Sequence, residues 1–227
     1  MTRMFGRKGT RSDSAGPDEQ PPDTVRLSMD DIGRYVIAAT RARGYPEDFL
    51  PNAARRVRFL EARGLPGFTA FVREMLTARH ETLAQRAQVT RPDGSTGGQC
   101  PMIDSVRIGE KLDVIVALPA GQAATYPTPS NPLLVVPKLA DYAGPKGIIM
   151  MATFYVGDEP LTRVFVDGHR AALDGPVSGL VAADMLGISR FPEETHGVPP
   201  LGAASVDKVD FPTRMVRDLM KAIEGCQ

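Results

Sequence analysis

The chain has 227 residues, the length of one ordinary domain or of one domain with an appendage. Apolar residues make up 42% of it, but no stretch approaches the roughly 18 to 20 consecutive apolar residues of a membrane span. The basic first residues have no apolar segment behind them, so they do not form a secretory signal. Cys100 and Cys226 cannot build a disulfide framework. We therefore expect a soluble, cytoplasmic protein that does not act on a membrane.

The net charge at pH 7 is zero, but the two halves of the chain differ in sign. Residues 1–91 carry 16 Lys and Arg against 11 Asp and Glu, and residues 92–227 carry 11 against 16. The basic half could attract an anionic ligand or an acidic partner, or it could simply carry solvated helix faces. Overall neutrality, nine Phe, five Tyr and no Trp argue against nucleic acid as a partner.

Residues 1–23 are rich in Gly, Pro, Ser and charged side chains, and this composition predicts a disordered leader. Ser28 and Asp31 then resemble a capping box at the start of a helix. Pro51 falls inside the second helical segment, so that helix either starts at Pro51 or is kinked there. Three segments have apolar residues at helical spacing, at about 28–44, 46–63 and 67–87.

The pattern changes near Thr90, where a turn-rich loop over 91–101 begins. Asp167-Gly168 predicts a tight hairpin that leads to a strand near His169. A short helix and an amphipathic C-terminal helix are expected over 177–186 and 212–224. Short apolar or β-branched runs bounded by Gly or Pro predict strands at 113–118, 133–136, 148–156 and 163–166.

Helices followed by hairpin-connected strands are typical of an α+β fold. We expect an N-terminal three-helix layer packed on a mostly antiparallel sheet, with the C-terminal helix closing the molecule. Behind the leader, residues 24–227 should form a single domain. Its helical part would cover 24–89 and its strand-rich part 90–227.

Several segments resemble an uncharacterised bacterial family of unknown function. They are Leu27 to Ile32, Gly44-Tyr45-Pro46 and Val57 to Gly67, which are similar to the opening of that family. A Cys-Pro pair and a Pro-Leu-Leu-φ-φ-Pro strand follow in the family, and Cys100-Pro101 and residues 132–137 match them. The resemblance spans about residues 27–210. It implies a shared fold and brings no activity.

Cys100, His169 and Asp167 are the candidate catalytic residues. Cys100 follows Gly97-Gly98-Gln99, whose backbone N–H groups could serve an oxyanion. Its thiolate becomes a nucleophile where a base or a cation lowers the pKa, although a small apolar residue anchoring a loop would look the same. His169 follows a turn and could act as a general acid or base, or be a polar turn flank.

Ligand-binding candidates are Arg55, Arg58, Gly97 and Gly98. The two arginines belong to one helix and could clamp a carboxylate, or carry solvated charge. No phosphate-binding loop and no Gly-x-Ser-x-Gly elbow occurs. His196 near two glutamates lacks a spacing that would direct them to one metal ion, so no metal site is predicted and the cofactor stays unknown.

Two functions remain open. The first is a non-catalytic accessory protein that acts through a protein partner or a second copy of itself, for instance as an enzyme subunit. The missing catalytic motifs and the abundant Met and Arg favour it. The second is a small-molecule enzyme with a pocket between helices and sheet that uses Cys100 and His169.

Overall fold

The computed structural model describes residues 23–77, 101–127, 131–191 and 207–225. The predicted leader up to residue 22 and the predicted loop up to residue 100 lie outside these ranges. The last ten residues of the third predicted helix, 78–87, lie outside them as well. Their predicted conformations therefore stay predictions.

Three helices open the described chain, as predicted. They are α1 (Met29–Ala42), α2 (Leu50–Glu61) and α3 (Gly67–Thr77). Ser28 and Asp31 form the predicted capping box, and hydrogen bonds from Ser28 lower the pKa of Asp31 to about 2. Pro51 occupies the first turn of α2, where its missing N–H has no intrahelical partner to lose, so α2 starts there without a kink.

A two-stranded ribbon joins the two ends of the described chain. Strand β1 (Thr24–Ser28) pairs antiparallel with β7 (Lys208–Pro212), and α8 (Thr213–Glu224) follows. The helix α8 was predicted, whereas the ribbon was not. Phe211 of β7 is buried and meets Phe68 of α3 edge to face at a centroid distance of 5.0 Å. The ribbon is thereby fixed to the helical layer.

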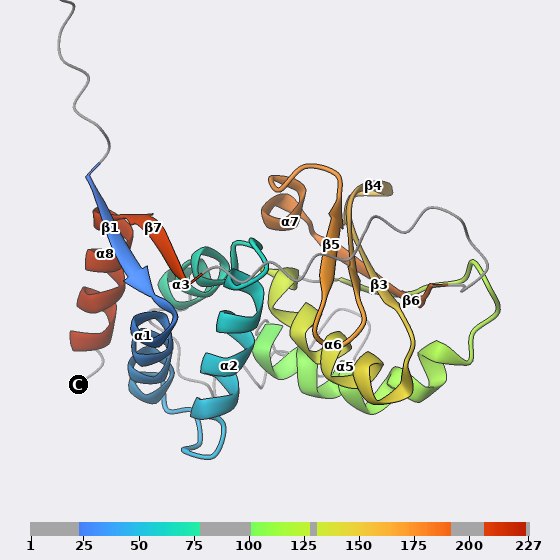
Figure 1. The fold of residues 1–227 in the computed structure, drawn as a ribbon, viewed down its shortest axis with the longest axis horizontal. Helices are drawn as coiled ribbons and strands as arrows, with labels where there is room; N and C mark the ends of the chain where they lie inside the picture. Colours follow the sequence, from blue (N-terminus) through green and yellow to red (C-terminus); the bar gives the residue numbers. More distant parts are fainter. Residues whose placement is uncertain (1–22, 78–100, 128–130, 192–206, 226–227) are drawn as a thin grey trace, which may run out of the picture.

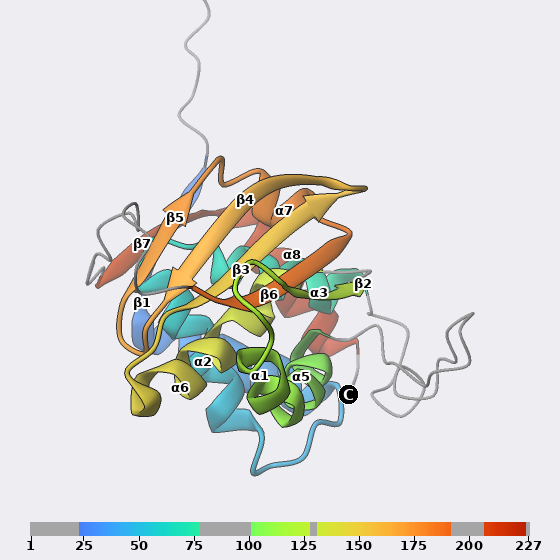
Figure 2. The ribbon, with the colours of Figure 1, turned by 90° about the vertical axis from the view of Figure 1, so that its right-hand side faces the viewer.

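The second sheet has five strands in the order β2-β6-β3-β4-β5, all antiparallel to their neighbours. Figure 2 shows the helices on one side of it. Helices α5 (Pro101–Val116) and α6 (Val136–Lys146) contact it directly, and α2 packs on α6. The five strands are β2 (Ala124–Pro127), β3 (Met150–Val156), β4 (Glu159–Val166), β5 (Ala171–Asp174) and β6 (Met185–Arg190).

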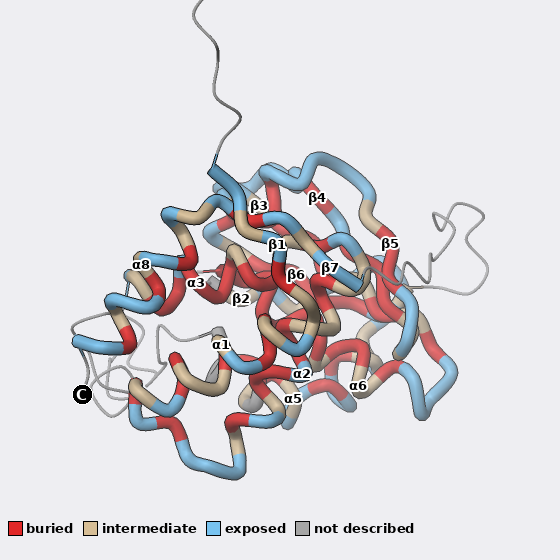
Figure 3. Tube along the Cα trace, turned by 60° about the vertical axis from the view of Figure 1, so that its left-hand side comes forward, coloured by how far each residue is buried: buried red, intermediate tan, exposed pale blue. Residues whose placement is uncertain are grey.

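The predicted α+β class is thus confirmed, with an N-terminal three-helix layer, an antiparallel sheet and a C-terminal helix. Buried residues run from α1 through α2 and α6 to the sheet and form one cluster (Figure 3). Leu60, Leu139 and Phe154 are among the fully buried members of this core. One continuous core joins the helices to the sheet.

Two predicted strands are wrong. Residues 113–118 belong mostly to α5, in which Ile108, Leu112 and Ile115 are buried while Val114 is 69% exposed. That spacing is helical, because alternate residues of a strand would share one face. Residues 133–136 form a 3₁₀ turn (Pro132–Val135) and the start of α6.

The predicted helix over 177–186 is only partly right. A single turn, α7 (Gly179–Ala182), lies at the end of the sheet, and β6 has already begun at Met185. The predicted hairpin at Asp167-Gly168 is confirmed, although β5 begins at Ala171 rather than near His169.

Candidate functional site

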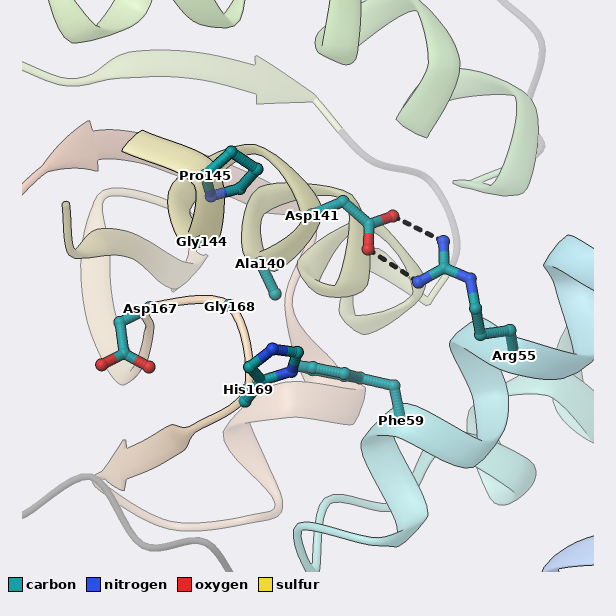
Figure 4. A pocket seen from close by; sticks show the side chains of 9 residues that line it. All are labelled: Arg55, Phe59, Ala140, Asp141, Gly144, Pro145, Asp167, Gly168 and His169. Carbon is teal, nitrogen blue, oxygen red and sulfur yellow. Dashed lines mark hydrogen bonds and ion pairs between the residues drawn. The ribbon is translucent and has the colours of Figure 1, made fainter. Parts of the chain in front are cut away.

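A cavity of about 500 Å³ lies where α2, α6 and the β4–β5 turn meet (Figure 4). Three of the residues singled out in the sequence, Arg55, Asp167 and His169, line it. The others give it a largely apolar and backbone wall; they are Phe59, Ala140, Asp141, Gly144, Pro145 and Gly168. The cavity therefore lies between two helices and the turn at the end of a hairpin.

The β4–β5 turn places His169. Val166 pairs with Ala171 across the hairpin, and the N–H of Asp167 donates to the carbonyl of Arg170 at 3.3 Å. Gly168 and His169 are therefore the two central residues of the turn, one position later than predicted. Arg170 donates to the Asp167 carboxylate from its backbone N–H at 3.2 Å and from Nε at 2.9 Å, which fixes the turn from within.

Two glycines let this turn approach α6 closely. Gly168 has a φ of 98°, and a Cβ built on it would lie 2.7 Å from the Cα of Gly144 in α6. No side chain fits at that distance. The approach forms the floor of the pocket from backbone atoms.

Arg63, which follows α2, ties the same turn to the helical layer. Its guanidinium donates from Nε at 2.8 Å and also from Nη2 to the carbonyl of His169. It donates from Nη1 to the carbonyl of Phe59 at 2.8 Å and lies 3.7 Å from the Phe59 ring centroid. Burial lowers the pKa of Arg63, and the Asp167 carboxylate partly offsets this. The sequence analysis missed this anchoring role.

Arg55 of α2 and Asp141 of α6 close the opposite rim of the pocket. Two hydrogen bonds of 2.7 Å make the pair bidentate, and Asn52 accepts a third from Arg55 at 2.9 Å. This pairing raises the pKa of Arg55. Arg55 was predicted to clamp a ligand carboxylate, but a carboxylate of the chain itself already holds it.

The pocket offers one polar side chain that these contacts leave uncommitted, the exposed imidazole of His169. Figure 4 shows it beside Phe59, with the Asp167 carboxylate turned away from the Arg55–Asp141 pair. Asp167 has Arg170 as its partner in the described part of the chain and does not orient the imidazole. No acid–base dyad is therefore built from the predicted pair.

The remaining predicted residues do not join the pocket. Arg58 faces α1, where it lies 3.5 Å from the Asp30 carboxylate and beside Gly33. Cys100, Gly97 and Gly98 lie outside the described residues. Phe59 and Asp141 complete the pocket but gave no signal in the sequence, because one looks like a helix-face aromatic and the other like a surface acid.

The described residues contain no group of three or more His, Cys, Asp or Glu that could hold a metal ion. Within the same ranges, no helix combines the length and apolarity that crossing a membrane requires.

A second surface feature lies at the other end of the sheet, where β3 turns into β4. Val156, Leu161 and Val177 are 41%, 38% and 46% exposed there. The hydroxyl of Thr162 donates to the carbonyl of Pro176 at 2.7 Å, which holds the segment with Val177 beside the strand with Leu161. The N–H of Gly157 donates to the Asp184 carboxylate at 3.1 Å and ties the hairpin to the end of α7.

The charged residues of the same segments are mainly acidic. We call residues 156–163 and 174–184 together the acidic tip; it carries Asp158, Glu159, Asp174 and Asp184, all exposed, and a single basic residue, Arg163. Arg163 lies 3.3 Å from Asp174. The tip therefore combines a net negative charge with three exposed aliphatic side chains, Val156, Leu161 and Val177, which we call its aliphatic centre.

Comparison of the chain with protein-family models, with curated proteins and with solved structures gives no match in any of the three. The resemblance to an uncharacterised bacterial family thus stays a prediction.

Proposed function

We propose that this chain is a non-catalytic accessory protein of the cytoplasm that binds a protein partner through its acidic tip. The exposed aliphatic centre of the tip carries this proposal. Val156, Leu161 and Val177 come from two segments held together by hydrogen bonds, so the surface they present is built by the fold. Grouped apolar side chains with a polar rim are typical of interaction sites.

The charges of the tip define the partner. Asp158 and Glu159 have no ion-pair partner among the described residues, and they flank the aliphatic centre. A segment with aliphatic or aromatic side chains between Lys and Arg would match both features. Such charges mainly steer the encounter and select the partner, while the apolar contact supplies most of the affinity.

Pocket chemistry supports the same proposal from the other side. The charged groups that line the cavity are paired within the chain, Arg55 with Asp141 and Asp167 with Arg170. These pairs hold α2, α6 and the β4–β5 turn in place. That is a structural role, and it leaves His169 without a base or acid to work with in the described part of the site.

The test is native mass spectrometry of the full chain purified gently from its source cells. We expect a stoichiometric second polypeptide, which Leu161→Asp and Val177→Asp remove. Val114→Asp, on the exposed face of α5, is the matched control and should keep the partner. A lone chain that turns over a small molecule, or a partner that survives both tip substitutions, would contradict the proposal.

A small-molecule enzyme is the second candidate, favoured by the convergence of Arg55, Asp167 and His169 on one cavity. In that case the chain would carry excess mass from a bound ligand, and His169→Ala would abolish turnover of it. Cys100→Ser tests the predicted nucleophile separately. Unchanged activity in that variant would remove Cys100 from the mechanism.

A further inference from the structure

We propose that residues 1–11 of this chain bind its own acidic tip and compete there with the partner. The inference rests on the proposed function in using the same surface, and it adds a second occupant that the chain itself supplies. Residues 1–11 lie outside the described part of the structure. The support for this contact comes from their sequence and from the position of β1, to which they are attached.

The sequence of this segment has the chemistry that the tip selects. Residues 1–11 contain Arg3, Arg7, Lys8 and Arg11 and no acidic residue. Met4 and Phe5 stand between the first two arginines, so apolar side chains are flanked by cations. This arrangement is complementary to an aliphatic centre flanked by carboxylates.

The tip has charges to offer such a segment. Asp174 is paired with Arg163, and Asp184 accepts the backbone N–H of Gly157. Asp158 and Glu159 lie on the turn between β3 and β4, where Gly157 and Asp158 are the two central residues. Both carboxylates are exposed, and in sequence they follow Val156 closely. Because they are exposed, they can pair with Arg and Lys side chains and still keep most of their hydration.

The attachment point also suits this occupant. In Figure 1 the described chain enters β1 at the upper left of the molecule, and α7 and the start of β4 also lie along its top, to the right of β1. Residues 12–22 connect the basic segment to β1. Eleven residues span up to about 36 Å when extended, and a tether of that kind raises the local concentration of its end to about the millimolar range.

A weak contact is therefore enough for occupancy. Pairing between exposed charges is screened by salt, with a Debye length of about 8 Å at physiological ionic strength. We expect the segment to leave the tip as salt rises, and a partner with more apolar contact area to displace it. A partner that binds the tip more weakly than residues 1–11 would then fail to displace them.

Chemical shifts of backbone amides in the full-length, ¹⁵N-labelled chain test this contact. Arg7→Glu with Lys8→Glu should move the amide signals of residues 156–161 and 175–184, and 0.5 M NaCl should move the wild-type signals in the same direction while having little effect on the variant. Arg217→Glu with Lys221→Glu, on exposed positions of α8, is the matched control and should leave the tip signals unchanged.

A charge swap makes the test specific. Asp158→Lys with Glu159→Lys should release the segment, and combining it with Arg7→Glu and Lys8→Glu should restore the wild-type response to salt. Tip signals that ignore all of these changes would overturn the inference. Shifts that depend on protein concentration would overturn it too, because the occupant would then be the segment of a second copy.

The two proposals fail separately. If the tip ignores the basic segment but Leu161→Asp still removes a partner, the accessory function stands and the intramolecular contact does not. If the tip responds to the segment and no partner is found in native mass spectra, the intramolecular contact stands and the accessory function does not.

Discussion

Glu61 is a carboxylic acid that is almost completely buried. Its side chain lies at the junction of α2 and α3, is 4% exposed, and accepts the backbone N–H of Phe68 at 2.6 Å. Burial raises the pKa of Glu61 to about 7, although the hydrogen bond from Phe68 opposes the shift. Glu61 thus caps the start of α3 from the preceding helix. Its carboxyl group binds a proton more tightly in the folded chain than in the unfolded chain.

The free energy of unfolding should therefore fall as pH rises from about 4.5 to about 7, because in this window the folded chain holds a proton that the unfolded chain has released. Glu61→Gln keeps an oxygen for the Phe68 N–H and removes the titration. We expect it to be more stable than wild type by about 3 kcal/mol at pH 8 and similar to it at pH 4.5. Urea unfolding at both pH values measures this.

The exposed Glu110→Gln is the matched control for Glu61→Gln. It should follow the wild-type pH dependence, because its side chain is hydrated in both states. Equal stability of wild type and Glu61→Gln at pH 8 would show that Glu61 is ionised without penalty and that the capping contact alone matters.

Gly168 shows how a single missing Cβ sets the shape of the pocket. We expect Gly168→Ala to lower the free energy of unfolding by about 2 to 4 kcal/mol, from the positive φ and from the clash with Gly144. Gly157 also has a positive φ, 58°, but no atom lies within 4 Å of the place where a Cβ would stand. Gly157→Ala should therefore lose only the free energy that the positive φ costs. Equal losses for the two variants, measured in urea, would refute the close approach.

At the scale of elements, the periodicity of buried positions decided which predictions held. The run at 113–118 is rich in β-branched residues and reads as a strand by itself. Ile108, Leu112 and Ile115 continue a helical stripe from upstream, and this stripe was visible in the sequence. A short window hid it, because propensity is weaker than the packing of an amphipathic face.

The run at 133–136 was ambiguous for another reason. Leu133, Leu134 and Val135 are all buried, and a fully buried run has no period from which to tell a strand from a helix. Pro132 and Pro137 lie in the first turns of the 3₁₀ turn and of α6, where prolines favour helix starts as readily as they bound strands.

Arg63 joins two elements whose contact no pattern in the sequence predicts, the end of α2 and the β4–β5 turn. Arg63→Lys retains the charge but cannot reach the carbonyls of Phe59 and His169 together. We expect it to lower the free energy of unfolding by about 1 to 2 kcal/mol and to speed hydrogen exchange in the β4–β5 hairpin.

Arg58→Lys is the control for Arg63→Lys, since the ion pair that Arg58 makes within the described ranges is with the exposed Asp30, at 3.5 Å. Its effect should be small and should not reach the hairpin. Unchanged exchange of the Ala171 and Ala172 amides in Arg63→Lys would mean that Gly144 and Gly168 hold the turn without it.

On the scale of the whole molecule, the sequence predicted which residues line the cavity better than which residues contact one another. Arg55, Asp167 and His169 were each singled out, and they do line one cavity. Nothing in the chain placed residue 55 beside residue 169, because that distance in sequence is closed by the packing of α2 on α6. Their partners, Asp141 and Arg170, were not predicted for the same reason. Because of these ion pairs, Arg55 and Asp167 are held by the chain itself.

The ribbon of β1 and β7 is the longest-range pairing in the fold, and neither strand was predicted. Each is five residues long and has one well-buried apolar side chain, Leu27 in β1 and Phe211 in β7. Val25 and Val209 are partly buried as well, so apolar and polar residues alternate in both strands, but over only five residues beside a segment expected to be a disordered leader. Arg26 and Asp210 face each other across the ribbon in a bidentate pair at 2.7 and 2.8 Å, and the pairing lowers the pKa of Asp210.

Because this ribbon closes the molecule, its apolar anchor should matter more than its ion pair. Phe211→Ala removes an aromatic side chain packed on Phe68, and we expect a loss of about 3 to 5 kcal/mol in the free energy of unfolding. Asp210→Asn breaks an exposed pair and should change it little. Urea unfolding with hydrogen exchange of β1 separates the two cases. Should Asp210→Asn prove the more damaging, β1 and β7 would be held together mainly by charge, and raising salt would loosen them.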